Sequence, residues 1–227
     1  MKRAFPILAV FTAVLLGYAF YEALWVAPME RTMGDVQRIF YYHVPSAWTA
    51  FLLFTVNLVA SVIYLVRRSA RADAVALVSA EVGVVFCTIV LVTGPIWARP
   101  VWGIWWTWDV RLTTTLVLWL IYVSYLVLRR FSDSSQTPKL AAVLAIFGAL
   151  DVPLVYFSIW FFRTQHPQPV IGGGGSIDPR MLHVLLLNWL AFSCLAFLVC
   201  WSRYRIEWMQ REVDEMETLE SLHGVAQ

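Results

Sequence analysis

Six long apolar runs constrain this 227-residue chain more than any other feature of its sequence. Each is long enough to cross roughly 30 Å of hydrocarbon as a helix that rises about 1.5 Å per residue. The runs lie near residues 4–26, 47–66, 74–97, 112–128, 140–162 and 181–201. Their apolar character is nearly continuous, without strict alternation of polar residues, which favours helices over a membrane β-barrel. We therefore expect an all-α integral membrane protein, a bundle of six transmembrane helices.

Composition excludes several classes of protein. Hydrophobic residues make up 60% of the chain and charged residues only 14%, which excludes a soluble cytosolic enzyme. The net charge of +2 gives no case for nucleic acid as a partner. Cys87, Cys194 and Cys200 all lie in apolar stretches and form no Cys-x-x-Cys pair, so we expect packing residues.

The distribution of basic residues predicts the orientation of the bundle. With six spans, the 17 lysines and arginines divide into eleven on one side and six on the other, which places both termini in the cytoplasm. The eleven are Lys2, Arg3, Arg67, Arg68, Arg71, Arg129, Arg130, Lys139, Arg203, Arg205 and Arg211, and the six are Arg31, Arg38, Arg99, Arg111, Arg163 and Arg180. We expect a six-span membrane domain over 1–205 and an acidic cytoplasmic tail over 206–227. In that tail an apolar stripe of Ile206, Met209, Val213 and Met216 either binds a partner or lies against the cytoplasmic loops.

Tryptophan is concentrated in the second outer connection, which reads WARPVWGIWWTWDVRLT over 97–113. Its tryptophans are Trp97, Trp102, Trp105, Trp106 and Trp108. If 101–112 forms an external amphipathic helix, Trp102, Trp105, Trp106 and Asp109 share one face, an aromatic shelf that would suit a porphyrin. The alternative is a helix that lies in the lipid headgroup layer. We expect Trp119 and Trp189, by contrast, to face lipid or neighbouring helices.

Two histidines flank this segment on the same predicted surface. His43 lies in IFYYHVPSAW, just before the second span, and His166 lies in FFRTQHPQP, just after the fifth. Two neutral imidazoles can hold one haem iron between them. His183, at the head of the sixth span, is an alternative to His166, whereas His223 falls in the tail on the other side.

The segment VWGIWWTWDVRLT closely resembles the "WWD" signature of haem-handling membrane proteins. Together with QRIFYYHVPSAW and TQHP, it makes residues 5–205 similar to the CcmC family, the haem exporter protein C of cytochrome c maturation. The resemblance implies a haem-transfer protein, rather than a classical enzyme, in the bacterial inner membrane with its site facing the periplasm. It implies haem b as a transient cargo, ligated by His43 and His166 against the WWD segment and delivered to the haem chaperone CcmE. The ABC transporter subunits CcmA and CcmB and the small membrane protein CcmD are the other implied partners.

Outer arginines are the candidates for binding the haem propionates, because a partly buried carboxylate needs guanidinium or backbone donors. Arg38 and Arg111 match family positions proposed to face the propionates, and Arg99 is a third candidate. Contact of these arginines with lipid headgroups is the alternative. We expect Asp109 to fix the shelf, either by accepting a hydrogen bond from an indole or by pairing with Arg111.

Two other functions remain open at this level. A membrane haem transporter or channel would use polar groups inside the spans, and Asp151, in the middle of the fifth span, is the feature in its favour. Asp151 could instead stabilise a kink at Pro153. A cytochrome b-like electron-transfer subunit would place its histidine ligands within the spans, and none of the four histidines is predicted at mid-span.

Overall fold

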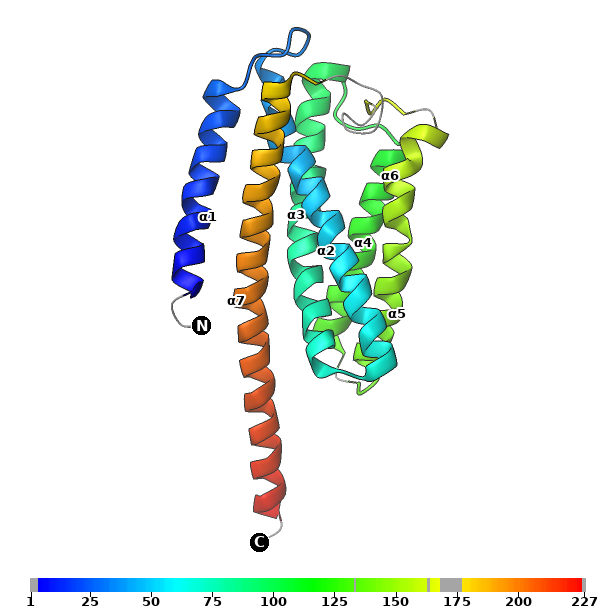
Figure 1. Ribbon diagram of the computed structural model, residues 1–227. Helices are drawn as coiled ribbons and strands as arrows, with labels where there is room; N and C mark the ends of the chain where they lie inside the picture. The colour runs from blue at the N-terminus through cyan, green and yellow to red at the C-terminus, as the bar shows by residue number, and fades with distance from the viewer. Residues whose placement is uncertain (1–3, 133, 163, 168–176, 226–227) are drawn as a thin grey trace.

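The computed structural model describes residues 4–132, 134–162, 164–167 and 177–225, and its regular elements are helices (Figure 1). Six helical stretches are long and apolar enough to cross a membrane, which confirms the predicted six-span all-α fold. They are Ala4–Val26, Asp35–Arg67, Ala70–Trp102, Val110–Phe131, Thr137–Phe161 and Pro179–Ser221. Lys2, Arg3 and Arg163 lie outside the described residues, and the orientation of the bundle across the membrane stays a prediction.

The first helical stretch coincides with its apolar run, whereas the second and third extend beyond theirs. Helix α1, Ala4–Tyr21, passes into a π-helical turn, η1, Glu22–Val26. A 3-10 turn, η2, Asp35–Ile39, leads directly into α2, Phe40–Arg67. The turn to α3, Ala70–Trp102, is short because Arg68 adopts a left-handed conformation and the Ser69 hydroxyl accepts a hydrogen bond from the Ala72 amide.

The core of the bundle forms where α2 and α3 pack against α4, Val110–Phe131. Phe54 of α2 stacks on Tyr122 of α4 with 3.8 Å between ring centroids. Gly83 of α3 permits this arrangement, because a Cβ at that position would lie 2.7 Å from Cε1 of Phe54. The close approach of α2 and α3 therefore depends on a glycine at position 83.

The fifth span is broken into α5, Thr137–Ala149, and α6, Asp151–Phe161. The Leu150 amide donates to the carbonyl of Phe147, three residues back, instead of continuing the α-helical pattern. Pro153 has no amide to donate to Ala149, so the break lies in the turn that a proline disrupts. Asp151 is buried beside this break, a position that fits a role in the kink.

Helix α7, Pro179–Val225, is a single helix of 47 residues that passes position 205 without a break. In Figure 1 it crosses the bundle beside α1 and extends well beyond the opposite end, toward the C-terminus. Asn188 of α7 donates to the carbonyl of Ala19 over 3.3 Å, and Phe5 meets Trp201 edge to face, so α1 is held mainly by α7. The predicted site residues lie on helix ends and connections at the other end of the bundle, which we call the histidine end.

Candidate functional site

A cavity of about 760 Å³ opens at the histidine end of the bundle. Its volume lies within the usual range of small-molecule sites, about 300 to 1,000 Å³. Side chains from α2, α3, α4, α6 and α7 line it together with the loops at 30–33 and 165–167. Most of its lining is apolar or aromatic, and His43 and His166 both contribute to it. We call it the histidine cavity.

His43 lies within α2, one turn after its start, and not in a loop before the second span as the sequence suggested. The helical stretch begins well before the apolar run because η2 leads directly into α2, and Pro45 lies inside α2. The His43 ring is buried and meets Trp97 edge to face, with 5.8 Å between centroids. A helix therefore holds this imidazole against α3.

The protonation of His43 follows from its neighbour Thr93. The His43 Nδ1 atom lies 2.8 Å from Thr93 Oγ1, and this hydroxyl donates its own proton to the Ile89 carbonyl over 2.7 Å. Thr93 can then only accept, so His43 Nδ1 carries the proton and donates it. The Nε2 atom of a neutral His43 is left with a free lone pair, the form that binds a metal.

His166 reaches the same state by a different route. Its Nδ1 atom lies 2.9 Å from the carbonyl oxygen of Pro167, which can only accept a hydrogen bond, so Nδ1 is protonated and Nε2 is free. Burial, and the nearby charge of Arg111, lower the pKa of His166 to about 4. The imidazole is therefore neutral at physiological pH and able to act as a ligand.

The tryptophan segment is not the continuous helix predicted over 101–112. Helix α3 ends at Trp102, Gly103 adopts a left-handed conformation with φ of 79°, and α4 begins only at Val110. Glycine takes this conformation at little cost and ends the helix, while Asp109 caps the next one. The prediction of one helix over 101–112 is wrong. It followed the helical spacing of the tryptophans, whereas Gly103 ends one helix and Asp109 begins the next.

The five tryptophans consequently separate into two groups. Trp97, Trp102 and Trp106 line the histidine cavity. Trp105 and Trp108 do not line it and are 58% and 75% exposed. The aromatic surface thus combines the end of α3 with one residue of the following loop, and Trp105 is absent from it.

Asp109 organises the loop around His166. Its Oδ1 accepts from the Leu112 amide over 3.0 Å, and its Oδ2 accepts from the hydroxyls of Thr107 and Thr164 over 3.1 and 2.9 Å. The Thr164 hydroxyl in turn accepts from the His166 amide over 3.0 Å. Asp109 therefore fixes structure, as expected, but through threonines and a helix amide instead of an indole or Arg111.

The three candidate arginines differ in where their guanidinium groups lie. Arg111 lines the histidine cavity, and within the described residues its Nη1 atom is buried without a hydrogen-bond partner. Arg38 does not line the cavity. Its guanidinium group pairs with Asp35 over 3.0 Å and donates to the Ala23 carbonyl over 2.9 Å. Arg99 donates to the Gly103 carbonyl and also lies outside the lining.

Several residues of the site were not identified from sequence. Trp48 and Trp189 line the cavity and meet edge to face at 5.4 Å. Trp189 therefore contacts a neighbouring helix, as expected, and also contributes to the cavity. Tyr156 of α6 lines it as well. These residues lie in ordinary apolar helices, and only the packing of α2, α6 and α7 brings them together.

His183, the alternative ligand, is exposed on α7 and does not line the cavity.

The donor groups of the cavity indicate what it can hold. The indole Nε1 atoms of Trp97 and Trp106, like Arg111 Nη1, are buried without a partner in the described part of the chain. Buried donors of this kind require an acceptor, and an anionic one suits a guanidinium best. The fold and site define a class: an integral membrane protein of six helices, with an aromatic cavity that presents two neutral imidazoles and several unused donors.

Comparisons with known proteins agree with this class. The model of the CcmC family, heme exporter protein C, matches residues 1–219, and the chain belongs to that family. It is 35% identical over 222 residues to the "Heme exporter protein C" of Bradyrhizobium diazoefficiens, covering 96% of this chain and 84% of that protein. It is 33% identical to the protein of the same name from Escherichia coli, covering 88% of this chain and 82% of the relative. A "Putative cytochrome c biosynthesis ccmC-like mitochondrial protein" of Marchantia polymorpha is 33% identical over 194 residues, which are 85% of this chain and 83% of that protein.

Proposed function

We propose that this protein binds haem b in the histidine cavity and delivers it to the haem chaperone CcmE during c-type cytochrome biogenesis. Membership of the heme exporter protein C family supports a role in haem handling for cytochrome c maturation. One observation carries the assignment to this cavity: His43 and His166 both line it, and the Nδ1 atom of each lies within hydrogen-bond distance of an oxygen, which favours the tautomer with the proton on Nδ1. Two free Nε2 atoms are what bis-histidine ligation of haem iron requires.

The remaining lining suits the other parts of a haem molecule. Trp97, Trp102 and Trp106 offer broad aromatic surface to a porphyrin ring, which gains both burial and stacking. Arg111 and the two indole donors without partners would bind the propionates. Arg38 and Arg99 do not bind propionates in this proposal, because their guanidinium groups already donate to the carbonyls of Ala23 and Gly103.

The two ligands differ in how they are held, and this difference suits a carrier that releases its cargo. His43 is built into α2 and anchored to α3 through Thr93. His166 lies in a connection after α6, held through Thr164 and Asp109. We propose that His43 is the constant ligand and that haem leaves the protein when His166 gives way.

The orientation of the site completes the proposal. The charge distribution of the sequence favours a cytoplasmic location for both termini, which would place the histidine end at the periplasmic face of the inner membrane. CcmE would then meet the cavity from that side. CcmA, CcmB and CcmD are the other proposed partners, following the resemblance of the chain to the CcmC family.

Absorption spectra of protein purified from haem-replete cells test this function. Wild type should carry haem at less than one equivalent, removable by acid acetone, since a carrier must exchange its ligand. His43→Ala and His166→Ala should each change the low-spin spectrum and lower the haem content. His183→Ala is the matched control, because His183 is exposed outside the cavity, and it should resemble wild type.

Three results would contradict the proposal. Spectra unchanged in both His43→Ala and His166→Ala would show that neither residue binds iron. Loss of haem in His43→Ala and His183→Ala, but not in His166→Ala, would assign the second ligand to His183. Full, non-exchangeable occupancy with rapid reduction by a quinol would instead support an electron-transfer subunit.

A further inference from the structure

Helix α7 is longer than a membrane requires. Its 47 residues span about 70 Å at about 1.5 Å per residue, against roughly 30 Å of hydrocarbon. In Figure 1 its C-terminal part projects beyond the other helices at the end opposite the histidine end. A helix that leaves its bundle needs support from contacts at its base or from a partner along its exposed length.

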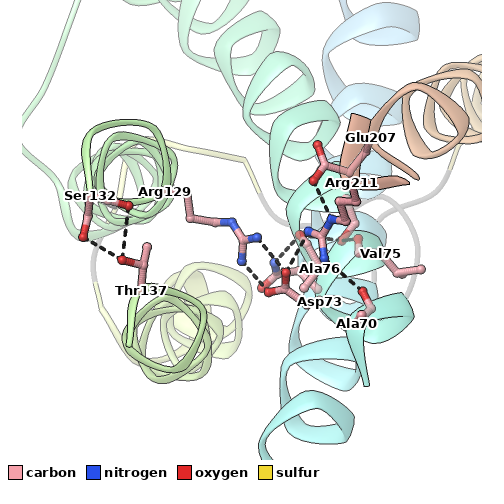
Figure 2. A network of polar contacts seen from close by, with 11 residues as sticks. Ala70, Asp73, Val75, Ala76, Arg129, Ser132, Thr137, Glu207 and Arg211 are labelled. Carbon is pink, nitrogen blue, oxygen red and sulfur yellow. Dashed lines mark hydrogen bonds and ion pairs between the residues drawn. The ribbon is translucent and has the colours of Figure 1, made fainter. Parts of the chain in front are cut away.

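Ion pairs at the base of this projection set its rotation. Arg211 Nη2 lies 2.8 Å from Asp73 Oδ2, and Arg211 also binds Glu207 one turn earlier over 2.8 Å (Figure 2). Asp73, in the first turn of α3, is held from its other side by Arg129 of α4. Arg203 adds a bond to Glu81 of α3 over 2.9 Å. The face of α7 that carries Glu207 and Arg211 is therefore fixed toward α3.

An apolar stripe runs along the opposite face. At about 100° per residue, Ile206, Met209, Val213 and Met216 gather on one side of the helix, roughly half a turn from Glu207 and Arg211. Between 46% and 56% of each of these four side chains is exposed. Their alternating spacing of three and four residues is the a and d pattern by which helices pair. We call these four residues the α7 stripe.

The borders of the α7 stripe are acidic. The same helical geometry places Glu212 on one side of the stripe, Glu217 on the other and Glu220 at its far end. Asp214 and Glu215 add further negative charge, and the sequence contains no lysine or arginine after Arg211. Arg205 is basic and lies beside the first stripe residue, Ile206, so the acidic borders flank the stripe from Met209 onward. The surface thus combines an apolar centre with negative edges.

These charges distinguish among the possible occupants. A second copy of α7 would bring acidic borders against acidic borders, which opposes pairing. An anionic membrane surface would repel the same residues, and the ion pairs at the base direct the helix away from the bundle. We propose that the α7 stripe binds an amphipathic helix of another protein whose apolar seam is bordered by lysine or arginine. This interaction does not depend on haem binding.

A pair of designed peptides tests the proposal on the full-length protein in nanodiscs of neutral phosphatidylcholine. Both peptides are three heptads long and carry Leu at positions a and d. One has Lys at positions e and g and the other has Glu. Binding is measured by fluorescence anisotropy, with empty nanodiscs as the blank. The Lys peptide should bind at least about tenfold more tightly than the Glu peptide. The double substitution Val213→Asp, Met216→Asp should abolish binding. The triple reversal Glu212→Lys, Glu217→Lys, Glu220→Lys should transfer the preference to the Glu peptide.

Matched controls separate the stripe from net charge. Glu215→Lys changes the charge as much as Glu217→Lys does, but Glu215 lies on the opposite face, so it should leave Lys-peptide binding nearly unchanged. Equal binding of both peptides, or equal effects of these two single variants, would overturn the proposal. So would sedimentation that shows dimers lost in the Val213→Asp, Met216→Asp variant, because the occupant would then be a second copy. Haem content should stay at the wild-type level in every tail variant, so failure here is distinguishable from failure of the proposed haem function.

Discussion

The Nδ1 atom of His43 lies 2.8 Å from the Thr93 hydroxyl oxygen, and that hydroxyl donates onward to the Ile89 carbonyl of its own helix. With the threonine proton donated to Ile89, the hydroxyl oxygen accepts, and the bond runs from His43 to Thr93. The contact therefore fixes both the orientation of the ring and the nitrogen that stays free. A metal-binding histidine is commonly held in this way by an acceptor for its second nitrogen.

Replacing Thr93 by valine should weaken haem binding while leaving the fold intact. Valine keeps the shape of threonine but removes the acceptor, so the buried Nδ1–H of His43 loses its partner. Loss of such a partner lowers metal affinity by about 10- to 100-fold. Haem titration followed by absorption measures the change, and Thr93→Ser should restore most of the affinity because it keeps the hydroxyl.

Thr88→Val is the control for this prediction. Thr88 lies on the same helix and accepts a hydrogen bond from Trp119 over 2.8 Å, but it does not line the cavity. Its substitution should affect stability and spare haem affinity. If Thr93→Val and Thr88→Val lower haem affinity equally, Thr93 has only a general structural role.

The loss of haem affinity in tryptophan variants should depend on whether the ring lines the cavity, and not on its position in the motif. Trp102→Ala and Trp106→Ala should each cost about 1 to 3 kcal/mol of haem binding, roughly a fivefold to hundredfold loss of affinity, because both rings line the cavity. Trp105→Ala and Trp108→Ala should cost far less, since both rings are exposed outside it. Equilibrium titration of the four variants provides the comparison. A larger loss in Trp105→Ala than in Trp106→Ala would contradict this arrangement of the segment.

Hydropathy was sufficient to predict the six spans. In lipid the backbone N–H and C=O groups must be hydrogen-bonded within the protein, and a long apolar helix achieves this. It was insufficient to predict where those helices begin. The second span starts before His43, since polar residues such as Gln37 can be buried within the protein at the ends of a span. The sequence therefore predicted a loop around His43, whereas the structure has the first turns of α2 there.

The site illustrates the same division. The sequence singled out His43, His166, Trp97, Trp106 and Arg111 by their places in and around the tryptophan segment, and all five line the histidine cavity. By contrast, the hydroxyl that fixes the His43 tautomer belongs to a threonine fifty residues away. No local signal marks such a contact, since it depends on how α2 and α3 pack. Gly103 did provide a local signal for the end of α3, and the regular spacing of the tryptophans masked it.

Asp73 should be among the most sensitive positions for stability. Its carboxylate is buried and binds both Arg129 and Arg211, so Asp73→Asn leaves the buried Arg129 without this counter-charge, while Arg211 keeps its ion pair with Glu207. We expect a loss of about 3 to 5 kcal/mol in the free energy of unfolding. Thermal unfolding in detergent, followed by tryptophan fluorescence, checks this. Asp178→Asn, which breaks the exposed pair with Arg180, should cost less than about 1 kcal/mol. Comparable losses in the two variants would show that the Asp73 network adds little.

The loop that holds His166 should depend on a single hydroxyl. Thr164 donates to Asp109 Oδ2 over 2.9 Å and accepts from the His166 amide over 3.0 Å, so Thr164→Val removes both bonds. We expect haem to remain bound through His43 but to shift toward a five-coordinate spectrum, with Thr164→Ser restoring the six-coordinate form. Thr107 donates to the same Asp109 oxygen over 3.1 Å without contacting His166, which makes Thr107→Val the matched control. If Thr107→Val shifts the spectrum as far as Thr164→Val does, Asp109 acts only through the start of α4. If neither variant changes it, His166 needs no such support to bind iron.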